Sequence, residues 1–243
     1  MTPWKFKAPY HWYFKRAKLV FGVSKVICQE YTNRTGVNVT YLPPLIPFSI
    51  ASEDKKDLRK EYGFNTDENI FLSVGSLKKL KKPMAVVLAA ESLGINFLSK
   101  HNIRFVFAGD GPLKIEMKSF IKQHKLSKFV SLLGNVPREK VHEVYKLSDS
   151  YIISSDFEGT PISMLEAMAN KLLIIGSDVQ GINNILSQDG MGFLFDNANV
   201  QQLASIIEKV VSENLQSKKD NAQHFYLMHF SHEKILKQIK DVL

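Results

Sequence analysis

Residues 151–169 read YIISSDFEGTPISMLEAMA, which is a short apolar run, a polar loop and a helix-patterned segment. Thr160 precedes Pro161, and proline is favoured at the first helical position because an N–H there would have no intrahelical partner. We therefore expect a strand over 151–153 and a helix over 161–169, capped by the Thr160 hydroxyl. Units of this kind build parallel sheets that are covered by helices.

The same alternation of apolar runs and helical patterns continues through the rest of the chain from residue 69. It predicts strands near 70–74, 103–108, 129–133, 151–153, 172–175 and 192–195, and helices near 83–98, 113–124, 138–147, 161–169, 200–211, 217–227 and 232–242. Six strands in regular alternation with helices indicate an α/β fold, a Rossmann-like doubly wound parallel sheet. Ligands of such sheets bind at the carboxyl ends of the strands.

The first 50 residues have a different organisation. AKLVFGVS predicts a strand that runs into a helix at about 24–34, and VNVTYL and a proline-rich stretch follow. One or two strands cannot form a domain, so we assign residues 1–50 to part of another domain and a linker. Residues 51–222 then form the Rossmann-like domain, which opens with a charged helix. Residues 223–243 form a C-terminal helix that packs back toward the N-terminal part.

The positive charge of the chain is concentrated near its start. The 243 residues carry a net charge of +8, of which +6 lies in residues 1–50. Aromatic residues lie among these bases, a mixture that suits an anionic membrane surface or a nucleic acid. The cut face of an incomplete domain, which packs on a partner chain, has the same composition. We expect no nucleic-acid partner, and the membrane and partner-chain interpretations both stay open.

Several classes of protein are excluded by motifs that the sequence lacks. No apolar run approaches the roughly 18 residues of a membrane span, and the first 20 residues have no secretory h-region, so we expect a cytoplasmic protein. The single cysteine, Cys28, excludes an intramolecular disulfide. GDGPL after the strand at 103–108 fails the dinucleotide fingerprint, because Lys114 stands where glycine is needed. There is no P-loop and no metal-ligand motif, so we expect neither metal nor cofactor.

Two loops that follow strands contain groups suited to an anion. Residues 75–82, GSLKKLKK, place four lysines at the mouth of a strand, although such runs are usually solvated surface. At the start of the helix at 161–169, the free N–H groups of Ile162 and Ser163 and the helix dipole can bind a phosphate. Glu166 lies among apolar residues and needs a partner, either ligand hydroxyls or a nearby lysine.

Several motifs along the chain resemble those of the retaining glycosyltransferases of family 4. EGTPISMLEAMA, with glutamates at 158 and 166, is similar to the E-x7-E motif of that family. FLSVGSLKKLKK resembles its V-G-R-L-x-x-x-K-G loop, FVFAGDGPL its G-x-G-P turn, FVSLLGNV its F-L-G-x-V strand, and FSHEKILKQI its closing helix. The resemblance implies the GT-B fold, in which the second of two Rossmann-like domains holds most of a nucleotide-sugar donor and the first holds the acceptor.

The resemblance also implies a role for individual residues. Lys81 would contact the donor diphosphate and Glu158 a hydroxyl of the transferred sugar, so these two are the candidate catalytic residues. Glu166 would bind the ribose. The backbone at Val136 would meet the base, and the amides of Ile162 and Ser163 would hold the phosphates. The expected donor site is completed by Gly75, Ser76, Gly111, Thr160 and Pro161.

The sequence departs from the family at three places. Ser76 stands where the family has an arginine, which removes one of two cations from the leaving diphosphate. QGINN at 180–184 replaces G-G-x-P-E and lacks its carboxylate. Nearly the whole N-terminal domain of the family, with its glycine-rich loop and acceptor-side histidine, has no counterpart in these residues.

The resemblance therefore implies a retaining, metal-independent hexosyl transfer from a UDP- or GDP-sugar to a polysaccharide, a glycolipid or a similar acceptor, as in the synthesis of lipopolysaccharide or capsule. A partner chain would supply the missing acceptor domain, and the basic N terminus could meet the inner face of the membrane. The alternative is a non-catalytic truncated remnant or a donor-binding subunit.

Overall fold

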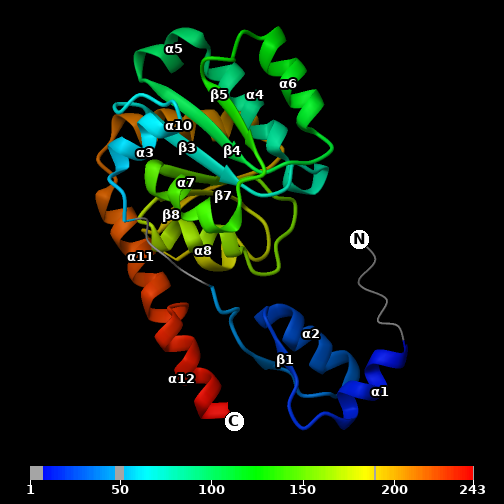
Figure 1. Cartoon of the computed structure of the whole chain (residues 1–243). Coiled ribbons are helices and arrows are strands. Elements are labelled where there is room, and N and C mark those ends of the chain that lie inside the picture. Colours follow the sequence, from blue (N-terminus) through cyan, green and yellow to red (C-terminus); the bar gives the residue numbers. More distant parts are fainter. Residues whose placement is uncertain (1–7, 47–51, 189, 243) are drawn as a thin grey trace.

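The computed structural model describes residues 8–46, 52–188 and 190–242. They form a large α/β domain and a small N-terminal lobe, and the two last helices extend from the large domain beside that lobe (Figure 1).

The large domain is built on a parallel sheet of six strands in the order β5-β4-β3-β6-β7-β8. The strands are β3 (Asn69–Val74), β4 (Ile103–Ala108), β5 (Val130–Gly134), β6 (Ser150–Ile153), β7 (Leu173–Ser177) and β8 (Gly192–Phe195). The chain builds outward from β3 to β5 and then returns to place β6 on the other side of β3. The predicted doubly wound α/β sheet is confirmed, and its topological switch point lies between β3 and β6.

Helices cover both faces of this sheet (Figure 1). One face packs on α3 (Lys55–Glu61), α7 (Val141–Leu147), α8 (Ile162–Ala169), α9 (Asn183–Leu186) and α11 (Gln216–His229). The other packs on α4 (Pro83–Leu93), α5 (Ile95–Lys100), α6 (Lys114–Gln123) and α10 (Val200–Ser212). Neighbouring strand residues point to opposite faces, as Ile70 and Leu72 do toward the first core and Phe71 toward the second.

Two of the predicted helices differ from the structure. The segment 83–98 is two helices, α4 and α5, because Gly94 between them has a φ of +78° that ends the α-helical path. The segment 138–147 begins as a 3₁₀ turn at Arg138–Lys140 and becomes α-helical only from Val141. Both corrections concern helix continuity and leave the order of the elements as predicted.

The N-terminal lobe consists of α1 (Ala8–Arg16), β1 (Phe21–Gly22), α2 (Lys25–Thr35) and β2 (Thr40–Tyr41). Its two strands pair in parallel over two residues each. Among the lobe's described apolar side chains, Cys28, Tyr31 and Val37 are buried. Ile46, at the end of this segment, is already buried in the core of the large domain.

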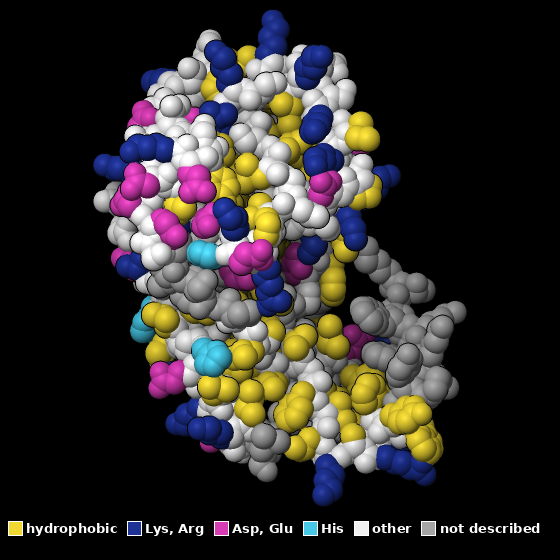
Figure 2. Space-filling model, in the orientation of Figure 1, with side chains coloured by type: hydrophobic (Ala, Val, Ile, Leu, Met, Phe, Trp, Pro, Cys, Tyr) yellow, Lys and Arg dark blue, Asp and Glu magenta, His cyan; other side chains and the backbone are white. Residues whose placement is uncertain are grey.

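Exposed apolar side chains are frequent near this lobe. Figure 2 shows hydrophobic side chains gathered over the part of the molecule where the lobe and the last helix, α12 (His232–Val242), lie. The exposed large hydrophobic residues of these elements include Trp12, Tyr13, Phe21, Val23, Ile27 and Leu236. Among the described residues, no helix combines the length and the apolar composition needed to cross a membrane.

Candidate functional site

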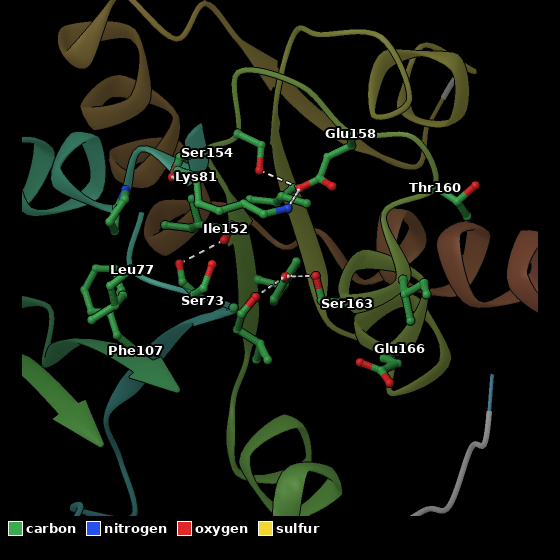
Figure 3. A pocket seen from close by; sticks show the side chains of 18 residues that line it. Ser73, Leu77, Lys81, Phe107, Ile152, Ser154, Glu158, Thr160, Ser163 and Glu166 are labelled. Carbon is green, nitrogen blue, oxygen red and sulfur yellow. Dashed lines mark hydrogen bonds and ion pairs between the residues drawn. The ribbon is translucent and has the colours of Figure 1, made fainter. Parts of the chain in front are cut away.

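A pocket of about 340 Å³ opens at the carboxyl ends of β3 and β6, at the switch point of the sheet. The loop after β3, the loop after β6 and the start of α8 form its walls (Figure 3). Eight of the eleven residues expected to bind a donor line it: Gly75, Ser76, Lys81, Glu158, Thr160, Ile162, Ser163 and Glu166. The fold therefore brings together residues that are up to 91 positions apart in the sequence.

Lys81 and Glu158, the two candidate catalytic residues, form an ion pair with each other. The Lys81 Nζ lies 2.6 Å from the Glu158 Oε1, which also accepts a hydrogen bond of 2.5 Å from the Ser155 hydroxyl. The side chain of Glu158 is 11% exposed and that of Lys81 is 37% exposed. The carboxylate is thus held firmly, whereas the ammonium group remains accessible from the pocket.

The lysine loop after β3 is fastened to the loop after β6. The Ser154 hydroxyl lies 3.0 Å from the carbonyl oxygens of both Lys81 and Lys82. The Asp156 amide donates to the Leu80 carbonyl at 2.8 Å, and the Lys82 Nζ lies 2.8 Å from the Asp156 carboxylate. These contacts fix the loop that carries Lys81. This part of the lysine-rich segment 75–82 is therefore not a freely solvated surface.

The start of α8 differs from the expected cap. Pro161 occupies the N-cap position, and the Thr160 hydroxyl, which the sequence predicts as the cap, instead donates to the Val23 carbonyl of the N-terminal lobe. The Ile162 N–H is not free, because it donates to the Thr160 carbonyl at 2.9 Å. The Ser163 N–H has no backbone acceptor within the described part of the chain. Ser163 is therefore the amide best placed to meet an anion at this helix end.

Glu166 is paired with a tyrosine. Its Oε2 accepts a hydrogen bond of 2.8 Å from the hydroxyl of Tyr145, and no lysine among the described residues forms an ion pair with it. Of the two partners considered from the sequence, the nearby lysine is therefore wrong, and the ligand hydroxyls stay a prediction. Burial raises the pKa of Glu166, and the Tyr145 hydrogen bond and the charge of Arg138 act in the opposite direction.

A second buried tyrosine holds the first turn of the same helix. The Tyr151 hydroxyl donates to the Ser163 hydroxyl at 2.7 Å. Burial raises the pKa of both Tyr145 and Tyr151, so both hydroxyls stay protonated. Sequence reasoning missed both residues, because a tyrosine in a strand and one in a helix are ordinary core residues until their hydroxyl partners are known.

Three of the expected residues do not line the pocket. Gly111 lies against the backbone of the loop after β3, where an added Cβ would come within 2.6 Å of the Leu77 oxygen. Val136 packs against the hydrophobic core, and Pro161 lines a second cavity that faces the N-terminal lobe. Gly111 therefore allows two loops to approach closely, and the structure does not place it or Val136 at the pocket.

The comparisons with known proteins agree with this fold. Saccharomyces cerevisiae has a phosphatidylinositol N-acetylglucosaminyltransferase GPI3 subunit that is 29% identical over 199 residues, covering 78% of this chain and 43% of the relative. The putative teichuronic acid biosynthesis glycosyltransferase TuaC of Bacillus subtilis is 28% identical, covering 83% of this chain and 50% of the relative. The chain thus spans half or less of the length of these curated relatives.

Solved structures show the same fold at low sequence identity. A glycosyltransferase from Rickettsia africae superposes with a TM-score of 0.81 at 17% identity, covering 98% of this chain and 67% of the other. Anabaena HepE in complex with UDP and glucose superposes with a TM-score of 0.78 at 17% identity, covering 93% of this chain and 63% of the other. The family model for glycosyl transferases group 1 matches residues 54–225, which is most of the chain. The chain therefore belongs to the group 1 family of glycosyl transferases.

Proposed function

We propose that this chain is the donor-binding half of a retaining glycosyltransferase of family 4 that uses a nucleotide-sugar. The observation that carries the proposal is the pocket at the switch point, which brings a cation, a helix N-terminus and two carboxylates into one cavity (Figure 3). Anionic nucleotides suit the carboxyl ends of parallel strands. The family to which the chain belongs and the relatives named as glycosyltransferases support it.

The pocket has a group for each part of such a donor. Lys81 and the Ser163 amide would meet the diphosphate, Glu158 a hydroxyl of the sugar, and Glu166 the ribose. When the bond between the sugar and the diphosphate breaks, the sugar gains oxocarbenium character and the negative charge grows on the leaving diphosphate. Lys81 and the α8 terminus would stabilise that charge without a metal ion. The acceptor would then attack from the face that the diphosphate leaves.

The acceptor side of the reaction would come from a second domain, which residues beyond this sequence or a partner chain would supply. The N-terminal lobe, with two short strands, supplies only part of such a domain. The GPI3 relative is named as a subunit, and the TuaC relative is named for teichuronic acid biosynthesis. A polysaccharide or glycolipid acceptor at the cytoplasmic face of a membrane is consistent with these names and with the aromatic and basic lobe.

A donor-binding subunit without catalytic activity is the second candidate. Ser76 lines the pocket where a second cation would help the diphosphate leave, and one such group contributes roughly 3 to 4 kcal/mol to a transition state. This candidate shares the donor site and differs only in turnover.

The first experiment is a thermal-shift and calorimetry panel of nucleoside diphosphates and their sugars. A ligand at 100 times its Kd stabilises the folded chain by about 2.7 kcal/mol. A selective response to UDP or GDP supports the donor site, and a well-folded sample that responds to none contradicts it. Transfer of the sugar by the chain with its partner, with retention of the anomeric configuration by NMR, separates the enzyme from the non-catalytic subunit.

A further inference from the structure

We propose that Tyr145 and Tyr151 are positioning residues that divide the donor site between them, Tyr145 orienting Glu166 for the ribose and Tyr151 orienting Ser163 for the diphosphate. This inference rests on the proposed function and goes beyond it, because neither tyrosine belongs to the motifs that identify the site. Both tyrosines are 1% exposed and both hydroxyls reach α8; Tyr145 lies in the core, and Tyr151 also forms part of the pocket wall.

Tyr145 acts on Glu166 from outside the pocket. The tyrosine belongs to α7 and does not line the cavity, whereas Glu166 does. Its hydroxyl lies 2.8 Å from the Glu166 Oε2, and the Oε1 forms no hydrogen bond with a described residue. Because Tyr145 holds the Oε2 of Glu166, the Oε1 can accept hydrogen bonds from the two ribose hydroxyls of the ligand. The carboxylate accepts at both oxygens, so Tyr145 does not compete with the ribose.

Tyr151 acts on the first turn of α8. Its hydroxyl donates to the Ser163 Oγ at 2.7 Å, and the Tyr145 hydroxyl lies 3.1 Å from the Ser163 carbonyl oxygen. The Tyr151 hydroxyl also lies 3.4 Å from the Val74 carbonyl oxygen, and its one proton goes to the closer Ser163 Oγ. The proton of the Ser163 hydroxyl is then available to a ligand oxygen. The Ser163 side chain is therefore held by Tyr151 at the wall of the pocket (Figure 3).

The two tyrosines should therefore affect different parts of one ligand. Glu166 would read the ribose hydroxyls and Ser163 would read the phosphates. Loss of the Tyr145 hydroxyl should reduce the preference for ribose, and loss of the Tyr151 hydroxyl should weaken binding whatever the sugar of the nucleoside. A general loss of stability would leave the preference for ribose unchanged, and it would also weaken binding of the nucleoside without phosphates, which the loss of the Tyr151 hydroxyl should not do.

The test measures the affinity of the full chain for UDP or GDP, whichever the wild type binds, and for the 2′,3′-dideoxy form of the same nucleotide. Hydrogen bonds to the Glu166 carboxylate predict a preference for the ribose form of about 10-fold or more in the wild type. Glu166→Gln should abolish most of this preference. Tyr145→Phe should reduce this preference by at least about three-fold. Tyr151→Phe should lower the affinities for both diphosphates by a similar factor and keep the preference, and it should leave the affinity for the nucleoside without phosphates unchanged.

Tyr62→Phe is the matched control, because the Tyr62 hydroxyl donates to Glu143 at 2.6 Å and neither residue lines the pocket. It should change neither affinity, and near-UV circular dichroism checks that every variant folds. A Tyr145→Phe variant that keeps the wild-type preference would overturn the role of Tyr145, and a Tyr151→Phe variant that binds both nucleotides normally would overturn that of Tyr151. A wild type that binds no nucleoside diphosphate would instead overturn the proposed function.

Discussion

Glu158→Gln is expected to move the affinities for two related ligands in opposite directions. In the structure the Glu158 Oε1 lies 2.6 Å from the Lys81 Nζ. The carboxylate therefore already forms an ion pair with the ammonium group that we assign to the diphosphate. A bare nucleoside diphosphate must draw Lys81 away from Glu158 and gains nothing from the carboxylate. A nucleotide-sugar also competes for Lys81 but regains a hydrogen bond from the sugar hydroxyl to Glu158.

The size of each change follows from the exposure of the pair. Lys81 is 37% exposed, and a pair so accessible to water contributes about 1 kcal/mol or less. Freeing Lys81 should therefore tighten the binding of the diphosphate by about two- to five-fold. The sugar hydroxyl exchanges a charged acceptor for a neutral one, which costs about 1 to 1.5 kcal/mol. The net effect on the nucleotide-sugar is a loss of up to about six-fold.

Isothermal titration calorimetry of the wild type and the variant with both ligands measures this difference directly. Glu208→Gln, which removes the same charge from an exposed position on α10, controls for net charge and should change neither affinity. The glutamine remains a hydrogen-bond acceptor of nearly the same shape, so a structural collapse is not expected. If both ligands bind more weakly, or both more tightly, the reasoning that Lys81 and Glu158 contact different parts of the donor is refuted.

Three further predictions concern two residues on the phosphate side of the pocket and one buried ion pair elsewhere in the large domain. Lys81→Ala should weaken diphosphate binding about ten-fold by calorimetry, whereas Lys79→Ala, an exposed residue in the same turn, should change it less than about two-fold. Ser76→Arg should tighten diphosphate binding at low salt, and the gain should fade as salt is raised to about 0.5 M; a gain that does not depend on salt would argue against a charge effect. Asp149→Ala should lower the free energy of unfolding in urea by about 3 to 5 kcal/mol, because it leaves the 6% exposed Arg59 without its carboxylate; a loss below about 1 kcal/mol would contradict this.

Much of the fold could be predicted because its signals are local. All six strands of the main sheet lie within two residues of the predicted positions, since buried parallel strands are short β-branched runs that helical patterns separate. The break at Gly94 was missed because glycine inside an apolar helical pattern is tolerated, and only its φ of +78° shows that the helix ends there.

The site was predicted less completely than the fold. Residues that follow strands, such as Lys81 and Glu158, could be assigned to one edge of the sheet, because all parallel strands end there. The partner of Glu166 could not be identified, since Tyr145 approaches it from another helix 21 positions away. The predicted Thr160 cap was wrong for a similar reason. The Thr160 hydroxyl donates to the Val23 carbonyl, which belongs to the N-terminal lobe and lies far away in the sequence.

The sequence by itself determined the class of the fold, the positions of the strands and the group of residues that follow the carboxyl ends of the strands. These follow from side-chain periodicity and from helix-end chemistry, which depend on residues close together in the chain. The tertiary structure decided the strand order, the ion pair of Lys81 with Glu158 and the two tyrosines beneath α8. Those features depend on which distant groups meet in a core where every buried polar atom needs a partner, and spacing along one chain does not encode that choice.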